Sequence, residues 1–263
     1  MLRLPLDKSA YEMVLHAIAA RMPPGAPLLV YGANDEGIKS AAKAFAPFFE
    51  NAETLMAKSH ARVWRATRSA VTAGLRGTLA AWRRVTPLML DGRERAWVSY
   101  PGVFAKGGLD AGTSLLLRHL PDGAGQAALD FGAGTGVIAR VLADRGARVT
   151  MIERDAVALE AARENVPEAE ALLGTALAET RFDLILSNPP IHRGKERDLG
   201  VVTQLIANAR RHLTKGGALL IVVQKTVPVP RLAEGHLRVV KLSGEEGGYR
   251  SWELSDGTLS SRV

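Results

Sequence analysis

Residues 129–136 read Leu-Asp-Phe-Gly-Ala-Gly-Thr-Gly, and this stretch decides the fold of the chain. A short apolar segment precedes it, and an apolar run with helical spacing follows at 137–142. The pattern predicts a buried strand, a tight turn and a helix that packs back on the strand. Glycines allow positive φ angles and a close approach of a ligand to the backbone. A helix N-terminus beside them favours a polar or anionic group. We therefore expect a nucleotide-type site at the carboxyl end of a strand in an α/β sheet.

The spacing of the glycines excludes two common kinds of nucleotide-binding site. Gly132, Gly134 and Gly136 do not match the dinucleotide fingerprint G-x-G-x-x-G, and no P-loop sequence G-K-[ST] follows them. Asp130 precedes the glycines, and a second acid, Glu153, ends the next expected strand. This arrangement resembles the S-adenosylmethionine (SAM) site of class I methyltransferases, in which the second acid binds the ribose hydroxyls.

The segments around the turn alternate between strand-like and helix-like patterns. Strands are expected at 127–130, 148–153, 171–173, 182–186 and 218–223, helices at 136–145, 155–165 and 202–213, and two last strands at 237–242 and 249–254. This alternation predicts an α/β fold of Rossmann-like type, with a doubly wound and mostly parallel sheet. The last strand pair would make one edge of the sheet antiparallel.

The N-terminal third repeats part of this pattern. A helix at 11–21, a glycine-containing break and a strand at 28–31 follow the same order as the segments at 202–223, at an offset of 191 residues. We therefore predict a small, truncated α/β domain at 1–85, the remnant of a second methyltransferase-like domain without its glycine-rich half, and a main domain at 86–263. The other expected elements are a helix at 38–49, a linker helix at 61–84, a hairpin turning at Asp91-Gly92 and a helix at 114–120.

Composition is that of a globular protein. Of 263 residues, 47% are hydrophobic and 23% charged, and the absence of cysteine excludes disulfides and thiolate metal sites. The six histidines lack metal-ligand spacing, so no metal site is expected. The longest strongly apolar run, 218–223, is too short to span a bilayer, and charges interrupt residues 1–20, unlike a signal peptide. We expect a cytoplasmic monomer with no membrane partner.

The net charge of +7 is concentrated in one acid-free segment between Glu53 and Asp91. The cations in this segment are Lys58, Arg62, Arg65, Arg68, Arg76, Arg83 and Arg84. Such a block favours a polyanion, most simply the phosphates of RNA or DNA, and the alternative is a solvated arginine-rich helix. Arg62, Arg65 and Arg68 are the expected contacts.

A second motif, Ser-Asn-Pro-Pro-Ile-His at 187–192, follows the strand expected at 182–186. That strand is expected beside the first one, so the motif and the glycine turn would share a crevice. Successive prolines fix the backbone and present carbonyl groups without N–H groups. With the side-chain carbonyl of Asn188 they can accept both hydrogens of a planar amine and orient its nitrogen toward a methyl donor, without a strong base. Asn188, Pro189 and Pro190 are thus the expected catalytic residues, and a purely structural turn is the alternative.

Taken together, residues 104–113, 130–136, 153, 187–192 and 216–217 resemble the bacterial small-subunit (16S) rRNA guanine-N2 methyltransferases, a family of small-domain methyltransferases. The resemblance implies SAM as cofactor, ribosomal RNA or the small ribosomal subunit as substrate, and an inactive first domain that binds RNA. The cofactor contacts that it implies are Phe104, Asp110, Gly112, Asp130, Gly132, Gly134, Gly136, Glu153 and Thr175.

The same crevice would bring Ile191 and His192 to the substrate. Ile191 stands where the family usually has an aromatic residue that stacks on the flipped base. The N-terminal domain is also shorter than that of the family. Two other readings stay open: a protein Gln or a DNA adenine as the methyl acceptor, and a non-catalytic RNA-binding protein.

Overall fold

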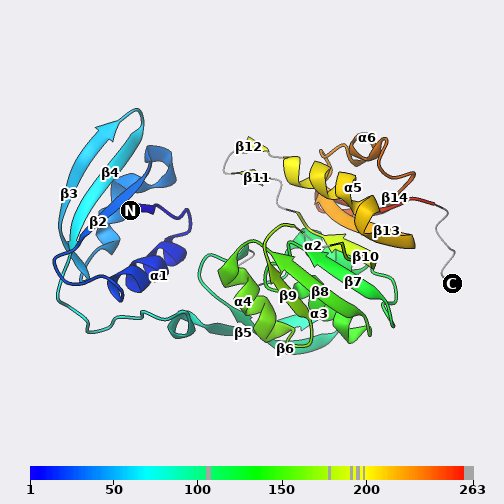
Figure 1. Ribbon diagram of the computed structural model, residues 1–263, viewed down its shortest axis with the longest axis horizontal. Helices are drawn as coiled ribbons and strands as arrows, with labels where there is room; N and C mark the ends of the chain where they lie inside the picture. The colour runs from blue at the N-terminus through cyan, green and yellow to red at the C-terminus, as the bar shows by residue number, and fades with distance from the viewer. Residues whose placement is uncertain (105–107, 177–178, 190–191, 194–195, 198, 258–263) are drawn as a thin grey trace. The chain divides into compact units, whose positions relative to one another are not determined.

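The computed structural model describes residues 1–104, 108–176, 179–189, 192–193, 196–197 and 199–257. The chain forms two compact units (Figure 1): an N-terminal unit of Met1–Arg84 with Tyr100–Gly102, and a C-terminal unit of Val85–Ser99 with Val103–Val263. In the described part of the chain, no helix is long and apolar enough to cross a membrane.

The C-terminal unit is built on a seven-stranded sheet in the order β14-β15-β13-β10-β7-β8-β9. These strands are β7 (Ala127–Phe131), β8 (Arg148–Glu153), β9 (Glu170–Leu173), β10 (Phe182–Ser187), β13 (Leu213–Gln224), β14 (Val239–Glu246) and β15 (Tyr249–Ser255). Strands β7 to β10 and β13 pair in parallel, whereas β15 pairs antiparallel with β13 and with β14. The predicted doubly wound, mostly parallel sheet with an antiparallel edge is confirmed.

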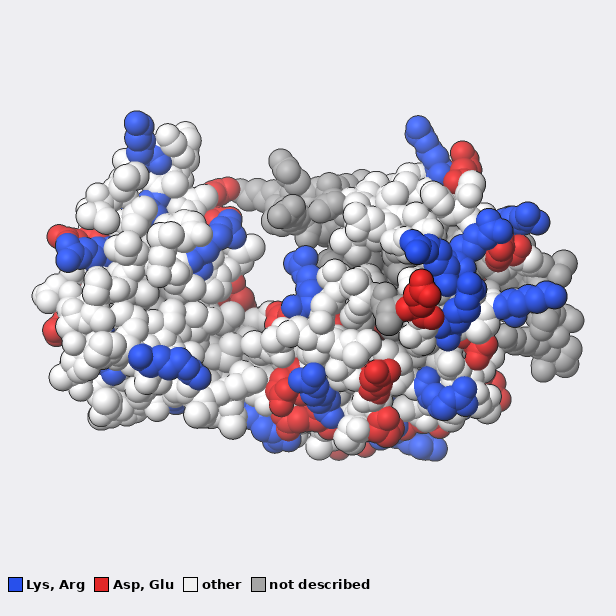
Figure 2. All heavy atoms as spheres, viewed as in Figure 1, with Lys and Arg blue, Asp and Glu red and all other residues white. Residues whose placement is uncertain are grey.

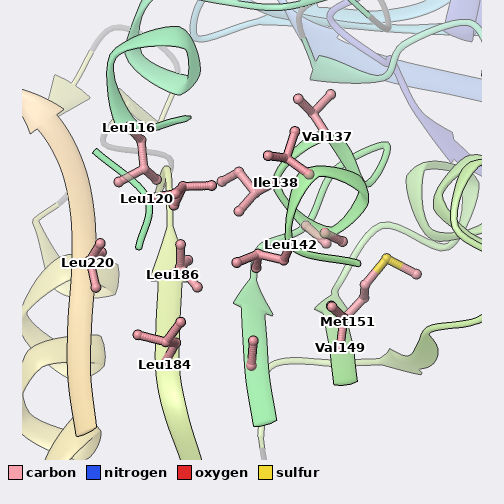
Figure 3. Packing of buried hydrophobic residues seen from close by; sticks show 14 of the residues in the cluster. Leu116, Leu120, Val137, Ile138, Leu142, Val149, Met151, Leu184, Leu186 and Leu220 are labelled. Atoms are coloured by element: carbon pink, nitrogen blue, oxygen red, sulfur yellow. The ribbon is translucent and has the colours of Figure 1, made fainter. Parts of the chain in front are cut away.

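Two hydrophobic cores lie on the two sides of this sheet. The helices of the C-terminal unit are α2 (Ala111–Leu117), α3 (Val137–Asp144), α4 (Ala156–Asn165), α5 (Gly200–His212) and α6 (Val229–Ala233). Leu184 and Leu186 of β10 pack in one core with α2 and α3 (Figure 3), and Ile185 between them packs in the other core with α5. Because successive side chains of a strand point to opposite faces, each central strand supplies both cores. This explains why the strands read as nearly continuous apolar runs.

Two short antiparallel pairs complete the C-terminal unit. Strands β5 (Arg84–Leu90) and β6 (Arg93–Ser99) form the predicted hairpin, with positive φ angles at Asp91 (50°) and Gly92 (76°) as a tight hairpin turn requires. Strands β11 (His192–Arg193) and β12 (Glu196–Arg197) form the second pair.

The N-terminal unit has a four-stranded sheet in the order β1-β2-β4-β3. Its elements are β1 (Leu2–Arg3), α1 (Lys8–Ala19), β2 (Pro27–Ala33), β3 (Phe49–Lys58), β4 (Ala61–Arg68) and the 3₁₀ helices η1 (Asn34–Glu36), η2 (Ile38–Ala44) and η3 (Leu79–Trp82). The helix expected at 38–49 is the shorter η2, and Pro47 blocks its continuation. The linker helix expected within 61–84 is wrong: this segment contains β4, which pairs along its length with β2 and β3.

The N-terminal sheet repeats one half of the larger sheet. Both β1-β2-β4-β3 and β10-β13-β15-β14 have one parallel pairing followed by two antiparallel ones, in the same chain order. The offset of 191 residues matches Val30 with Ile221, and their neighbours across the sheet are Leu2 and Ser187. Arg3 therefore corresponds to Asn188. No strand of the N-terminal unit, all of whose residues are described, corresponds to β7. The interpretation of this unit as the remnant of a second methyltransferase-like domain stays a prediction.

Candidate cofactor and substrate site

The glycine turn connects β7 to α3, and its three glycines have different surroundings. Gly132 and Gly134 adopt φ angles of 73° and 57°, and a Cβ added to either would meet no atom within 4 Å. A Cβ on Gly136 would lie 3.1 Å from Cγ2 of Val166 and 3.3 Å from Cβ of Ala162. Gly132 and Gly134 therefore border open space that a ligand can fill, whereas Gly136 lets α3 pack closely against α4.

Glu153 joins the end of β8 to this turn. Its Oε2 accepts a hydrogen bond of 2.9 Å from the backbone N–H of Gly134, and its Oε1 accepts bonds from the N–H groups of Arg154 and Asp155. The side chain is half-buried. A carboxylate has about four acceptor positions, so Glu153 retains capacity for a ribose hydroxyl at the rim of the turn.

Asp130 lies beneath the turn and is fully buried. Its Oδ2 accepts a hydrogen bond of 3.0 Å from the N–H of Ala139 in the first turn of α3, and its Oδ1 has no hydrogen-bond partner among the described residues. Burial raises the pKa of this carboxyl to about 7; the Ala139 N–H lowers it and the charge of Glu153 raises it. Asp130 therefore does not line the open space as expected, but lies beneath it and accepts an N–H group from the first turn of α3.

Asn188 comes directly after β10 and is held next to the glycine turn. The parallel pairing of β10 with β7 matches Leu186 with Asp130, and the buried hydroxyl of Ser187 donates a bond of 2.6 Å to the carbonyl of Phe131. The predicted proximity of the two motifs is confirmed. Pro189 is buried. The expected substrate and catalytic contacts Pro190 and Ile191, and the side chain of His192, lie outside the described residues.

The side-chain amide of Asn188 is anchored on helix α2. Its Nδ2 donates to both carboxylate oxygens of Asp110, at 3.2 Å each, and to Oγ1 of Thr113 at 2.9 Å. Asp110 is also the N-cap of α2, because Oδ1 accepts the N–H groups of Gly112 and Thr113. The site therefore combines an open glycine turn with a rigidly held asparagine at one edge of the sheet.

Comparison with known proteins assigns the family. Residues 94–252 match the model described as methyltransferase small domain, and residues 1–78 match the model described as methyltransferase small domain N-terminal. The chain belongs to the methyltransferase small domain family. It is similar to the ribosomal RNA small subunit methyltransferase C of Pseudomonas fluorescens, with 34% identity over 98% of this chain and 79% of the relative. The corresponding protein of Ectopseudomonas mendocina is 35% identical over 95% of this chain and 77% of the relative.

A solved structure shares the fold of this small-domain methyltransferase. It is a 16S rRNA N2 methyltransferase of T. thermophilus in complex with AdoMet (SAM) and guanosine. The TM-score is 0.88 at 24% identity, over 97% of this chain and 72% of that chain. The class I methyltransferase fold predicted from the glycine turn is thus confirmed.

Three expected cofactor contacts of this small-domain methyltransferase have other surroundings than the resemblance implies. Gly112 is buried, and a Cβ there would lie 3.1 Å from the ring of Tyr249, so this glycine serves the packing of α2 on β15. Phe104 is exposed over 68% of its surface, and Thr175 is exposed just after β9. Their contact with a cofactor stays a prediction.

Sequence patterns did not reveal the residues that lock the turn in place. The hydroxyl of Thr135 accepts a bond of 3.1 Å from Nε1 of the buried Trp97 in β6. Asn165, at the end of α4, donates to the carbonyls of Thr135 and Val98 and accepts the N–H of Val98. The hairpin thereby holds the turn from outside the sheet. No local pattern connects these positions, because they are up to 67 residues apart in the chain.

Arg68 is a correction to the expected RNA contacts. It is only 3% exposed, and its guanidinium donates to the backbone carbonyls of Ala19, Phe48, Ser69 and Val71. Its donors are used to join α1 to the loops around the N-terminal sheet. Because a phosphate cannot reach a guanidinium buried in this way, the expected role of Arg68 in binding RNA is wrong.

Asp130 provides a test of the electrostatics beneath the turn. The folded pKa of about 7 lies above the ordinary value of 3.8, so between these values the folded chain binds more protons than the unfolded chain. The stability contributed by this group is therefore fully present below pH 3.8. It falls as the pH rises from 3.8 to about 7 and is lost above that. We expect Asp130→Asn to gain thermal stability relative to wild type when the pH is raised from about 5 to about 8. Thermal unfolding followed by circular dichroism would measure the difference in Tm, and a difference independent of pH would contradict the assignment.

Proposed function

We propose that this protein is a SAM-dependent N-methyltransferase that modifies the exocyclic amine of a guanine in small-subunit ribosomal RNA. The observation that carries the proposal is the anchored amide of Asn188 directly beside the open glycine turn. The activity named for the relatives, and the guanosine bound to the T. thermophilus enzyme, support guanine as the acceptor. Such a substrate would place the protein in the cytoplasm, and we propose that it acts there as a monomer.

The residues at the turn fit SAM. The open space over Gly132 and Gly134 would admit the nucleoside, Glu153 would hold the ribose hydroxyls, and the carboxyl of Asp130, when ionised, would favour the cationic methionine end. When bound, SAM supplies a methyl group on a positively charged sulfur atom. The protein's part is to place the acceptor nitrogen in line with that methyl group.

Asn188 and Pro189 would orient the acceptor. The Oδ1 of Asn188 and the backbone carbonyl at Pro189 would each accept one hydrogen of the guanine amine, which holds the plane of the amine fixed. The nitrogen lone pair, perpendicular to that plane, then points at the methyl donor. One N–H proton leaves to solvent after transfer, so a strong base is unnecessary and positioning is the main contribution.

The test is methylation of defined substrates. Purified protein with methyl-labelled SAM and small-subunit rRNA, either free or in the subunit, should give N2-methylguanosine in nucleoside digests analysed by mass spectrometry. Label in DNA adenine or in protein Gln would favour the other acceptors. Tight SAM binding in calorimetry without methylation of any of these substrates would favour a non-catalytic RNA-binding protein.

We further propose that the N-terminal unit helps to hold the RNA. The guanidinium carbon of Arg62 lies over the ring of Trp64, 5.3 Å from the ring centroid. Arg65 is half-exposed, and its Nη1 lies 3.6 Å from Oε1 of Glu53. Figure 2 shows Lys and Arg spread over the visible face of this unit rather than gathered in one patch. Such an arrangement suits a broad contact with phosphates, which positions RNA without reading its sequence.

Charge reversal at these two arginines should weaken RNA binding and its salt dependence. Each lost phosphate contact removes close to one unit from the slope of log K against log[salt], so Arg62→Glu with Arg65→Glu should flatten the slope by about one to two units. SAM affinity should not change. The matched control is Arg211→Glu with Arg231→Glu, which alters net charge equally at exposed positions of the C-terminal unit. Equal slopes for the two double variants in a binding titration would remove the N-terminal arginines from the RNA site.

A further inference from the structure

Asn188, Asp110 and Thr113 form a closed hydrogen-bond network with one consistent direction. The hydroxyl of Thr113 donates to Oδ2 of Asp110, so its oxygen is the acceptor for Nδ2 of Asn188. Asp110 also receives Nδ2 of Asn188 and the two backbone N–H groups at the start of α2. Every member of the network that faces Asp110 is a donor, as an ionised carboxylate requires.

This direction determines which end of the Asn188 side chain is available to a substrate. The two protons of Nδ2 are directed to Asp110 and Thr113, so Oδ1 is turned away from the carboxylate. The reversed amide would place Oδ1 against both carboxylate oxygens, which is repulsive. Because the oxygen and nitrogen of an asparagine amide have nearly the same size, its orientation is determined by its hydrogen-bond partners.

We propose that Asp110 and Thr113 are positioning residues that set the orientation of the Asn188 amide, so that Asn188 presents an acceptor and not a donor to the substrate amine. The inference rests on the proposed function, because it concerns how the acceptor nitrogen is held. It gives Asp110 a role toward the substrate side of the site rather than the contact with the methionine end of SAM implied by family resemblance. The network thereby joins two segments, more than 70 residues apart in the chain, into one site that accepts hydrogen bonds from the substrate amine.

The variant Asp110→Asn tests the direction of the network without removing the helix cap. Asparagine is as good an N-cap as aspartate, and its oxygen would continue to accept the N–H groups of Gly112 and Thr113. The introduced nitrogen then takes the place of Oδ2 and donates to Thr113, whose proton turns toward Asn188. The Nδ2 group of Asn188 then faces N–H and O–H donors in place of acceptors. The Asn188 amide either loses these hydrogen bonds or reverses, and in both cases Oδ1 of Asn188 is no longer held toward the substrate.

The expected result is a loss of rate that depends on the presence of Asn188. In single-turnover methylation of small-subunit rRNA, Asp110→Asn should lower the rate roughly 10- to 100-fold, as for a lost hydrogen bond to a charged group. The Kd for SAM, measured by calorimetry, and the Tm should remain close to wild type. Added to Asn188→Ala, the same substitution should change the rate by less than about twofold, because residues that act through one another are not additive. A full additional loss in the double variant, or a weakened SAM affinity, would overturn the proposal.

Thr113 provides a matched pair of variants. Thr113→Ser keeps the hydroxyl and should retain most of the rate, whereas Thr113→Val keeps the shape and should lose rate to about the same extent as Asp110→Asn. Equal rates for the serine and valine variants would exclude the hydroxyl from the network.

A readout that needs no substrate separates this inference from the proposed function. In ¹⁵N NMR spectra, the side-chain amide signals that vanish in Asn188→Ala should show slow hydrogen exchange in wild type and fast exchange in Asp110→Asn. Fast exchange in wild type would overturn the network whatever the substrate. Slow exchange in a protein that methylates no RNA would contradict the proposed function and leave the anchored orientation of Asn188 standing.

Discussion

Replacement of Asn188 by alanine is expected to lower the methyl-transfer rate roughly 10²–10³-fold, the usual loss for one well-placed polar group in an active site. The reason is the removal of Oδ1, the acceptor that the contacts with Asp110 and Thr113 turn toward the substrate. SAM binding should be almost unchanged, because the glycine turn and Glu153 do not depend on this side chain. Single-turnover rates with saturating SAM and rRNA, together with the Kd for SAM, measure both effects.

The matched control for this substitution is Asn208→Ala. Asn208 is an exposed residue of α5, so the same chemical change there should leave the rate as in wild type. A rate for Asn188→Ala equal to that of the control would show that the amine is not oriented by this residue. The proposed mechanism would then be wrong even if rRNA is the substrate.

Replacement of Gly134 by valine is expected to abolish measurable SAM binding. The φ angle of 57° is one that β-branched residues avoid, and a Cβ at this position would enter the open space at the turn, where it meets no protein atom. The side chain would therefore occupy the volume assigned to the nucleoside. Because no protein atom is displaced, the cost to folding should be limited to the backbone strain of about 1–2 kcal/mol. Isothermal titration calorimetry and the far-UV circular dichroism spectrum measure the two consequences.

Gly235→Val separates the effect of strain from the loss of the site. Gly235 has a φ angle of 77° and likewise no atom within 4 Å of an added Cβ, but it follows α6 and is remote from the glycine turn in the chain. Both variants should lose similar thermal stability, and only Gly134→Val should lose SAM. Wild-type affinity in Gly134→Val would remove the turn from the cofactor site.

The parts of the site that could be predicted from the sequence are those whose function depends on the conformation of the backbone. Gly132 and Gly134 are needed because the turn requires positive φ angles and open space, and these two requirements hold for glycine whatever packs nearby. The apolar runs of the central strands reflect burial on both faces of a parallel sheet, and the position of Asn188 follows from the pairing of β10 with β7. These are local or strictly periodic constraints.

Side-chain roles were harder to predict than positions. Arg62, Arg65 and Arg68 follow one another at intervals of three residues and form one charged block in the sequence. In the structure Arg68 is buried among backbone carbonyls, whereas Arg65 is half-exposed and Arg62 lies over an aromatic ring. The segment is a strand rather than a helix, because pairing with β2 and β3 on both sides outweighs its local helical pattern.

The sequence by itself determined the α/β class, the glycine turn, the edge at which Asn188 lies and the half-repeat at the N-terminus, because each depends on spacing along the chain. Only the tertiary structure decided which way the Asn188 amide is turned and that Arg68 is buried. The partners that settle these two points, Asp110 for Asn188 and Ala19 for Arg68, are 78 and 49 residues away in the chain. The role of a polar side chain depends on which donors, acceptors and charges surround it after folding, and those are brought together by packing and not by sequence spacing.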